Sequence, residues 1–189
     1  RRIIKVGSRG SALALRQDEE LLALLRPLYP DLDFQIITIR THGDINPSGA
    51  LPEMGLGIFV REIERDLLGG DLDMAVHSLK DLPTQLPEGL ALGAVLKRQD
   101  ARDVLVNRWD CSLEKLPQGA RIGTSSPRRQ ALLRSLCPQV VPVPIRGNVE
   151  TRLRKAKSEE YDGAVLAAAG LDRLGLGGQI SEYLSPQKF

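Results

Sequence analysis

The stretch RIGTSSPRRQALLRSLC (121–137), followed by VVPVPIRGNVETRLRKA (140–156), decides the fold class of this 189-residue chain. In each part a short run rich in β-branched residues ends in a loop of small polar residues, and apolar residues at helical spacing follow. The predicted strand-into-loop and helical segments are 121–126, 127–137, 140–148 and 149–156. Strands that alternate with helices in this way are typical of α/β layers with largely parallel sheets.

The same alternation extends outward in both directions. Toward the N-terminus we predict strands over 3–6 and 34–40, helices over 12–29 and 58–68, and a short strand from 73 that becomes a polar loop before Pro83. Toward the other end, 90–98 is a further candidate strand and 161–176 reads as strand, turn and helix. The segment 44–57 holds three Gly and two Pro, and at this length it is typical of a lid or binding loop.

Length and composition indicate a globular protein of one large or two small domains. Apolar residues make up 42% and charged residues 26% of the chain, which excludes disordered and fibrous classes. The polar segment KRQDARD (97–103) is the best boundary in the sequence. We therefore expect a first domain over 1–96, a hinge over 97–102 and a second domain over 103–189.

Several classes of protein find no support in the sequence. No apolar run approaches the length of a membrane span, and the N-terminus opens with Arg1-Arg2 and not with an apolar signal segment. The two cysteines, Cys111 and Cys137, form no C-x-x-C pair, so we expect no metal, no disulfide and a reducing cytoplasmic setting. Aromatic residues are only 4% of the chain, which argues against a nucleic-acid partner.

The basic residues point to an anion. Nineteen of the 26 cations are Arg, whose planar fork suits carboxylate and phosphate groups. In GTSSPRR (123–129), Ser125 or Ser126 is a good N-cap, and Pro127 suits the first helical position. Two further cations, Arg128 and Arg129, then stand at the positive end of a helix dipole, which indicates an anion held with the hydroxyls of 124–126. The alternative is an ordinary capped helix with both arginines in solvent.

Two other turns repeat this arrangement. In IRGN (145–148), Arg146 ends a strand, Asn148 can cap the next helix and Arg152 follows within its first turn and a half. In GSRGS (7–11), Arg9 and Ser11 stand between the first strand and the first helix. Each copy alone is a weak signal, but three copies with Arg favour a site for a polyanion.

HSLKDLP (77–83) adds candidate chemistry at the end of a predicted strand. Asp81 can stabilise a developing cation and relay a proton, while Lys80 holds a substrate carboxylate. The alternative is a surface Lys-Asp pair, and His77 is more typical of a structural histidine. The fingerprints G-x-x-x-x-G-K-[ST], G-x-G-x-x-G and G-x-S-x-G are all absent, so nothing indicates a P-loop, a dinucleotide site or a nucleophile elbow.

Taken together and in order, these motifs resemble the porphobilinogen deaminases, also called hydroxymethylbilane synthases. The resemblance rests on GSRGSALAL, THGD, IFVREIE, VHSLKDLP, GTSSPRR, IRGNVETRLRK and LAAAGLDRLGL, and it covers the whole chain. It implies two domains similar to type II periplasmic binding proteins, each a mixed, mostly parallel sheet flanked by helices, with the active-site cleft between them. It also implies a transferase that joins four porphobilinogen units, with release of ammonia, into the linear tetrapyrrole hydroxymethylbilane of haem biosynthesis.

The resemblance implies roles for individual residues. Asp81 matches the catalytic aspartate. Lys80, Thr124, Ser126, Arg128 and Arg129 match residues that hold the carboxylates of a dipyrromethane cofactor. Arg9, Ser11, Arg146 and Arg152 match residues that bind porphobilinogen and the growing polyanion, and Phe59 matches an aromatic beside the pyrrole.

The sequence departs from the family pattern at two places. Leu56 stands where the family usually has Lys. The chain stops at LSPQKF, where the family continues with a segment that returns to domain one and a third domain that bears the cofactor cysteine; neither Cys111 nor Cys137 matches that cysteine. We therefore expect a monomeric fragment or shortened relative that is inactive alone, and the alternative is a non-catalytic two-domain module that binds an anionic solute.

Overall fold

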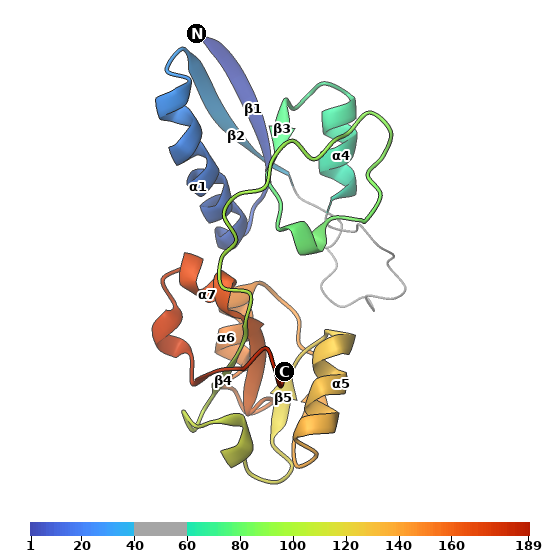
Figure 1. Cartoon of the computed structure of the whole chain (residues 1–189), viewed down its shortest axis with the longest axis vertical. Coiled ribbons are helices and arrows are strands. Elements are labelled where there is room, and N and C mark those ends of the chain that lie inside the picture. The colour runs from blue at the N-terminus through green and yellow to red at the C-terminus, as the bar shows by residue number, and fades with distance from the viewer. Residues whose placement is uncertain (40–59) are drawn as a thin grey trace. The chain divides into compact units, whose positions relative to one another are not determined.

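The computed structural model describes residues 1–39 and 60–189, in two compact units, Arg1–Lys97 and Arg98–Phe189 (Figure 1). Each unit has its own sheet and its own helices. The predicted loop 44–57, the start of the predicted helix 58–68, and the positions Leu56 and Phe59 lie outside the described residues.

The described residues of the first unit form a parallel sheet of three strands, in the order β2-β1-β3. The elements they make are β1 (Arg2–Arg9), α1 (Ala12–Leu28), β2 (Leu32–Ile39), α4 (Arg61–Leu68), β3 (Met74–Ala75) and the 3₁₀ turn η1 (Leu79–Asp81). The central strand β1 runs parallel to both neighbours along registers such as Val6 with Ile36 and Val6 with Met74. Val6, Leu22 of α1 and Ile63 of α4 are buried and form the core beside this sheet.

The second unit has a mixed sheet of five strands, in the order β6-β5-β7-β4-β8. Its strands are β4 (Asp103–Asn107), β5 (Arg121–Gly123), β6 (Val141–Val143), β7 (Gly163–Ala167) and β8 (Glu182–Tyr183). Strand β5 is parallel to β6 and β7, whereas β4 is antiparallel to β7 and β8. The helices are α5 (Pro127–Leu136), α6 (Val149–Lys155) and α7 (Ala168–Arg173), with 3₁₀ turns η2 (Leu113–Lys115) and η3 (Gly177–Gln179).

Strand β4 shows why this sheet is covered on both faces. Successive side chains of a strand point to opposite faces, and here both sets are buried. Leu105 packs in one hydrophobic cluster with Ile122 and Leu133, while Val104 and Val106 pack in a second cluster. An unbroken apolar run, and not an alternating one, is the pattern of a strand with cover on each side.

The structure confirms the α/β class and corrects three local predictions. The predicted strand 90–98 is wrong: no strand forms there, and Leu92 and Val95 are 53% and 66% exposed. An apolar run becomes a strand only where a neighbouring backbone offers hydrogen bonds, and no described residue pairs with this segment as a strand. The turn expected within 161–176 is also absent, because α7 begins at Ala168 directly after β7, and the strand β4 was not predicted at all.

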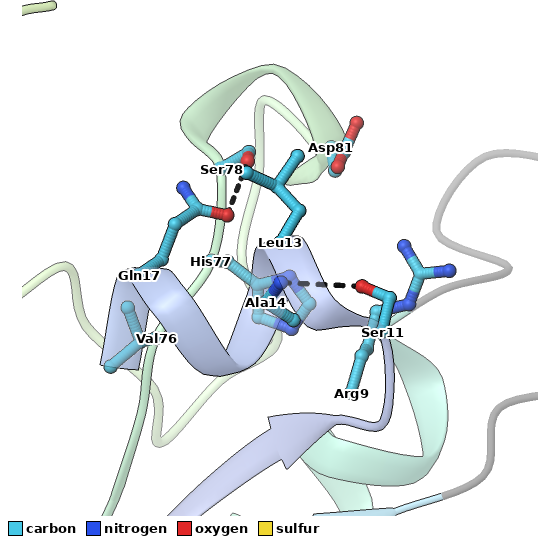
Figure 2. Close-up of a pocket in the computed structure, with 9 residues that line it drawn as sticks. All are labelled: Arg9, Ser11, Leu13, Ala14, Gln17, Val76, His77, Ser78 and Asp81. Carbon is cyan, nitrogen blue, oxygen red and sulfur yellow. Dashed lines mark hydrogen bonds between the residues drawn. The ribbon is translucent and has the colours of Figure 1, made fainter. Parts of the chain in front are cut away.

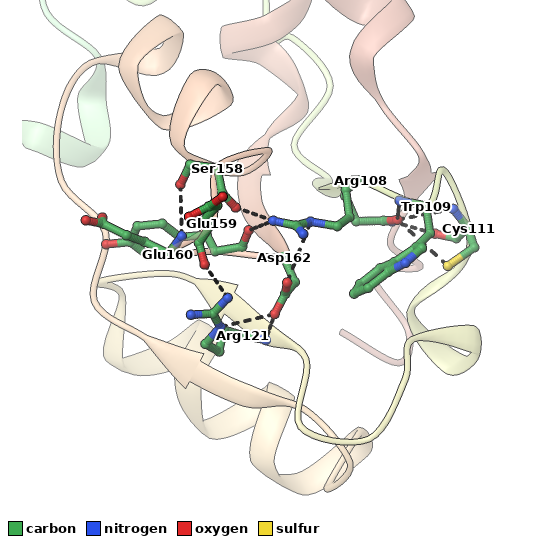
Figure 3. A network of polar contacts seen from close by, with 10 residues as sticks. Arg108, Trp109, Cys111, Arg121, Ser158, Glu159, Glu160 and Asp162 are labelled. Atoms are coloured by element: carbon green, nitrogen blue, oxygen red, sulfur yellow. Dashed lines mark hydrogen bonds and ion pairs between the residues drawn. The ribbon is translucent and has the colours of Figure 1, made fainter.

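A cluster of polar contacts connects the segments at the N-terminal ends of β5 and β7 in the second sheet (Figure 3). Asp162, just before β7, accepts from the backbone N–H of Arg121 at 2.9 Å and from its Nε at 3.2 Å. Arg108, which follows β4, lies 3.6 Å from the same carboxylate and donates to the carbonyl of Tyr161 at 2.9 Å. Arg108 and Arg121 are therefore structural, and they lie at the end of the strands opposite to the 123–129 turn.

The first residues of the second unit are tied to that unit. The Arg102 guanidinium donates to Asp100 at 2.6 to 3.0 Å and lies over the Tyr183 ring, 4.3 Å from its centroid. The Arg102 carbonyl accepts from Ala168 at 3.0 Å. These contacts belong to 100–102, the C-terminal half of the hinge predicted over 97–102, and that hinge stays a prediction.

Candidate functional site

The turn that follows β5 has the local geometry expected from its sequence. Of the two candidate caps, Ser126 is the N-cap of α5: its hydroxyl accepts from the backbone N–H of Arg129 at 3.4 Å, and Pro127 is the first helical residue. Thr124 is 1% exposed, and its hydroxyl oxygen accepts from the Ser126 N–H at 3.2 Å. Thr124 thus shapes the turn from within.

The turn that follows β6 lies beside it. Asn148 caps α6 by accepting from the Thr151 N–H at 2.9 Å, and Gly147 has a φ of 120°, where a Cβ would stand 2.5 Å from Thr151. Arg152 reaches back and donates through Nε to the Gly147 carbonyl at 2.7 Å. This bond holds the loop in its left-handed conformation.

Ser125 joins the two turns. Its hydroxyl donates to the Ile145 carbonyl at 2.8 Å and accepts from the Ile145 N–H at 3.1 Å. Because β5 and β6 are parallel neighbours, their carboxyl ends meet at one edge of the sheet, where α/β proteins hold ligands. Six of the predicted site residues come from this edge: Thr124, Ser126, Arg128, Arg129, Arg146 and Arg152.

The two arginines at the start of α5 form ion pairs with a carboxylate of the same chain. The carboxylate of Asp103, the first residue of β4, bonds the Nη2 of Arg128 through Oδ2 and lies 2.6 Å from the Nη2 of Arg129 through Oδ1. Arg129 also donates to the Val165 carbonyl at 3.1 Å. The side chains of Arg128, Arg129 and Asp103 are 58%, 13% and 8% exposed. The reading in which both arginines extend into solvent is therefore wrong for Arg129.

Asp103 is a site residue that sequence reasoning missed. Burial by itself raises the pKa of a carboxyl group, but the hydrogen bonds and charges of Arg129 and Arg128 outweigh burial and hold the pKa of Asp103 below its usual range. In the sequence, Asp103 is the last residue of the polar segment KRQDARD (97–103). The signal was its place directly before the apolar run VLV, since a charged residue that opens a buried strand needs a partner.

In the first unit, predicted residues line a small pocket (Figure 2). Ser11 is the N-cap of α1, and its hydroxyl accepts from the Ala14 N–H at 3.2 Å. Ser78 donates to the side-chain oxygen of Gln17 at 3.0 Å across the pocket. The polar residues that line it are Arg9, Ser11, Gln17, His77, Ser78 and Asp81.

Asp81 is the last residue of η1, six residues beyond the end of β3, and does not lie directly at the strand end. Its side chain is half-buried, and no hydrogen bond or ion pair of its carboxylate occurs within 1–39 and 60–189. Lys80, its neighbour, is exposed and is not among the residues that line the pocket. A half-buried carboxylate of this kind can accept a proton or stabilise a nearby cation.

His77 shares the pocket with Asp81 and Arg9. Burial lowers the pKa of His77; the charge of Asp81 opposes this shift, and the charge of Arg9 adds to it. Its Nε2 is buried and has no hydrogen-bond partner in the described part of the chain. The neutral imidazole is therefore favoured, as for a structural histidine at the wall of the pocket.

The first unit also buries a carboxyl group outside the pocket. Asp18 of α1 is 0% exposed, and neither of its oxygens has a hydrogen-bond partner among residues 1–39 and 60–189. Burial raises the pKa of Asp18 to about 6, and the charge of Glu19 adds to the rise; the nearby Ser8 hydroxyl limits it, although that hydroxyl donates its proton to the Arg9 carbonyl. From the sequence, Asp18 is predicted only to lie in the helix 12–29.

Comparison with known protein families shows to which family this chain belongs. Residues 4–189 match the family model described as "Porphobilinogen deaminase, dipyromethane cofactor binding domain". The chain belongs to the porphobilinogen deaminase family. The resemblance inferred from the motifs is thereby confirmed, and the dipyrromethane cofactor is a property of the family to which the matched domain belongs.

Curated relatives named porphobilinogen deaminase extend beyond the length of this chain. The protein of Syntrophomonas wolfei is 51% identical over 184 residues, which is 97% of this chain and 60% of that protein. The protein of Alkaliphilus metalliredigens is 50% identical over 189 residues, and that of Thermus thermophilus is 49% identical over 185. The chain spans about 60% of the length of each.

A solved structure supports the fold. A periplasmic substrate-binding protein of an ABC transporter from Coxiella burnetii superposes with a TM-score of 0.52 at 14% identity, over 97% of this chain and 79% of that one. This agrees with the predicted likeness to periplasmic binding proteins and concerns the fold alone. Within the described ranges, none of the helices has the length and apolar character needed to span a membrane.

Proposed function

We propose that this chain is the part of a porphobilinogen deaminase that holds the pyrrole carboxylates and the catalytic aspartate. The enzyme would join four porphobilinogen units, with loss of ammonia, into hydroxymethylbilane. The observation that carries the proposal is the sheet edge of the second unit, where two capped turns and four arginines gather. Each porphobilinogen brings two carboxylates, so the product is a polyanion that such an edge suits.

The donors at the start of α5 fit the carboxylates of the dipyrromethane cofactor. The N-cap hydroxyl of Ser126 and the half-exposed guanidinium of Arg128 would contact them, while Thr124 and Arg129 would shape the turn from inside. Lys80 would supply a further cation. The cofactor, when bound, supplies the primer to which pyrrole units are added. We place its attachment cysteine outside this chain, because neither Cys111 nor Cys137 matches it.

Substrate would be held by the remaining arginines and handled by Asp81. Arg9 and Ser11 of the first unit would bind carboxylates of porphobilinogen or of the growing chain, and so would Arg146 and Arg152 of the second unit. Asp81 would stabilise the cation that forms as ammonia leaves and would take up the pyrrole proton. Phe59, which is outside the described residues, stays a prediction as an aromatic beside the pyrrole. A cytoplasmic location, a monomeric state and inactivity of the 189-residue chain alone remain predictions.

The direct test is titration of this chain with porphobilinogen, followed by the chemical shifts of backbone amides. We expect the amides of 123–129 and 146–152 to move, and an Arg128→Gln variant to weaken binding. Arg134→Gln is the matched control, because Arg134 is an exposed arginine of the same helix. Unmoved amides in both turns at saturating ligand, or hydroxymethylbilane formation by the 189-residue chain alone, would contradict the proposal.

The alternative function, a binding module for an anionic solute without chemistry, draws on the fold likeness to a periplasmic substrate-binding protein. The intact mass of the natural gene product and the extent of its reading frame separate the two. A dipyrromethane adduct and a frame that continues past Phe189 favour the deaminase. A stop there, without an adduct and with tight binding of an anion unrelated to pyrroles, favours the module.

A further inference from the structure

The buried carboxylate of Asp103, at the start of β4, binds two arginines that have different roles. Arg129 is 13% exposed and is held at both ends of its guanidinium, by Asp103 and by the Val165 carbonyl. Arg128 is 58% exposed; one Nη is held by Asp103, and the other lies 3.4 Å from the Phe189 carbonyl. Arg129 is thus a brace between α5 and the sheet, whereas Arg128 keeps most of its surface available.

Asp103 cannot leave this position easily. Its backbone is part of the sheet: it pairs with Ala167 in the β4–β7 ladder, and its carbonyl accepts from the Leu184 N–H at 2.9 Å. Its side chain is only 8% exposed. A carboxylate on a mobile loop could compete with a ligand for the arginines and then withdraw, but one fixed in a central ladder remains with them when a ligand arrives.

We propose that Asp103 is a positioning residue, which holds the Arg128 guanidinium in a single orientation so that its remaining N–H groups meet an incoming pyrrole carboxylate. The proposal rests on the proposed function of the α5 turn. A guanidinium that is already held loses less side-chain freedom on binding, and the affinity gained in this way is that of preorganisation. Arg128 and Arg129 together with Asp103 carry one net positive charge, whereas the two arginines alone would carry two. This turn therefore suits one carboxylate at a time.

A double-mutant cycle tests the proposal through porphobilinogen binding. We expect Asp103→Asn to lower the affinity about tenfold when Arg128 is present, and by less than about twofold in the Arg128→Gln background. Asp100→Asn is the control, since Asp100 is an aspartate near Asp103 in sequence that pairs with Arg102 instead, and it should leave the affinity unchanged. An unchanged or higher affinity for Asp103→Asn, or an equal loss in both backgrounds, would overturn the proposal.

A second measurement uses the unaltered chain and does not depend on ligand binding. Nitrogen NMR of the guanidinium groups reports how fast each group rotates. We expect hindered rotation for both Arg128 and Arg129, and free rotation for Arg134 as the internal control. Free rotation of Arg128 would overturn the positioning role even if Asp103→Asn fails to fold. Hindered rotation together with no porphobilinogen binding would instead refute the proposed function of the turn.

Discussion

Among the described residues, each unit buries one aspartate, and the environments of the two carboxylates shift their pKa values in opposite directions. Asp103 in the second unit has two guanidinium partners, and its pKa is lowered. Asp18 in the first unit is fully buried without a hydrogen-bond partner among the described residues, and its pKa is raised to about 6. Burial disfavours the charged form of both carboxyl groups, so the presence or absence of a nearby cation decides whether the pKa falls or rises.

The same contrast separates the aspartates with proposed roles. Asp103 is committed to structure by its partners, while Asp81 lines a pocket with a carboxylate that no described residue binds. A paired, buried carboxylate stabilises and positions, whereas a half-buried one without such partners is available to substrate. The two should therefore respond differently to mutation.

The largest effect is expected at Asp81, on activity alone. In the full-length enzyme, Asp81→Asn should lower the rate of hydroxymethylbilane formation by at least about 100-fold, the usual scale for loss of a general acid or base. The unfolding transition should change little, because the carboxylate makes no described hydrogen bond or ion pair. The rate is followed by the absorbance of the oxidised product. A near-normal rate in this variant would remove Asp81 from its proposed role.

The next effect is expected at Asp103, on stability. Asp103→Ala leaves the largely buried guanidinium of Arg129 without its partner, which should lower the free energy of unfolding of the second unit by about 3 kcal/mol. Because the chain has two units, hydrogen exchange of β4, β5 and β7 amides measures this better than a single melting curve.

Two further observations sharpen the Asp103 result. Asp100→Ala, which breaks an exposed pair with Arg102, should leave the same amides almost unchanged. The stability that Asp103 contributes is present above its unfolded-state pKa, near 3.8, and should be lost as the pH falls through its lower folded-state value. Equal effects of the two alanine variants would contradict the contrast between a buried and a partly exposed aspartate.

Asp18 should show the opposite dependence on pH. Its folded-state pKa is about 6 against 3.8 in the unfolded chain, so the first unit should lose stability as the pH rises from about 4 to 6 and remain less stable above that range. Asp18→Asn should remove this dependence and stabilise the first unit at pH 8 by about 2–3 kcal/mol. Hydrogen exchange of α1 and β1 at pH 5 and pH 8 checks it. If the wild type and the variant respond to pH alike, the pKa of Asp18 is not raised in the folded chain.

The smallest effects are expected at the two serine caps, and they compare the turns directly. Ser11→Ala should destabilise the start of α1 by about 1 kcal/mol, a typical value for loss of an N-cap. Ser126→Ala should cost less, because its capping bond is longer, 3.4 Å against 3.2 Å. Exchange rates of the first-turn amides measure both, and a larger loss at Ser126 would reverse the order.

Local prediction succeeded where neighbours in the sequence supply the interaction. The caps at Ser11, Ser126 and Asn148 each accept from a backbone N–H three residues ahead, so a short window of sequence contains both partners. Prediction failed at 90–98 and at β4. Strand formation there depends on a neighbouring edge, which a single segment does not reveal.

The same distinction between local and long-range interactions applies to the candidate site. The sequence by itself determined the three turns, the arginines they carry and the family they resemble, because capping and motif spacing are local. Only the tertiary structure decided that Asp103 meets Arg128 and Arg129 across about 25 residues and that Asp18 meets no described cation. Charged side chains from distant segments interact only when strand pairing brings them together. The degree of burial then determines how strongly each interaction affects stability.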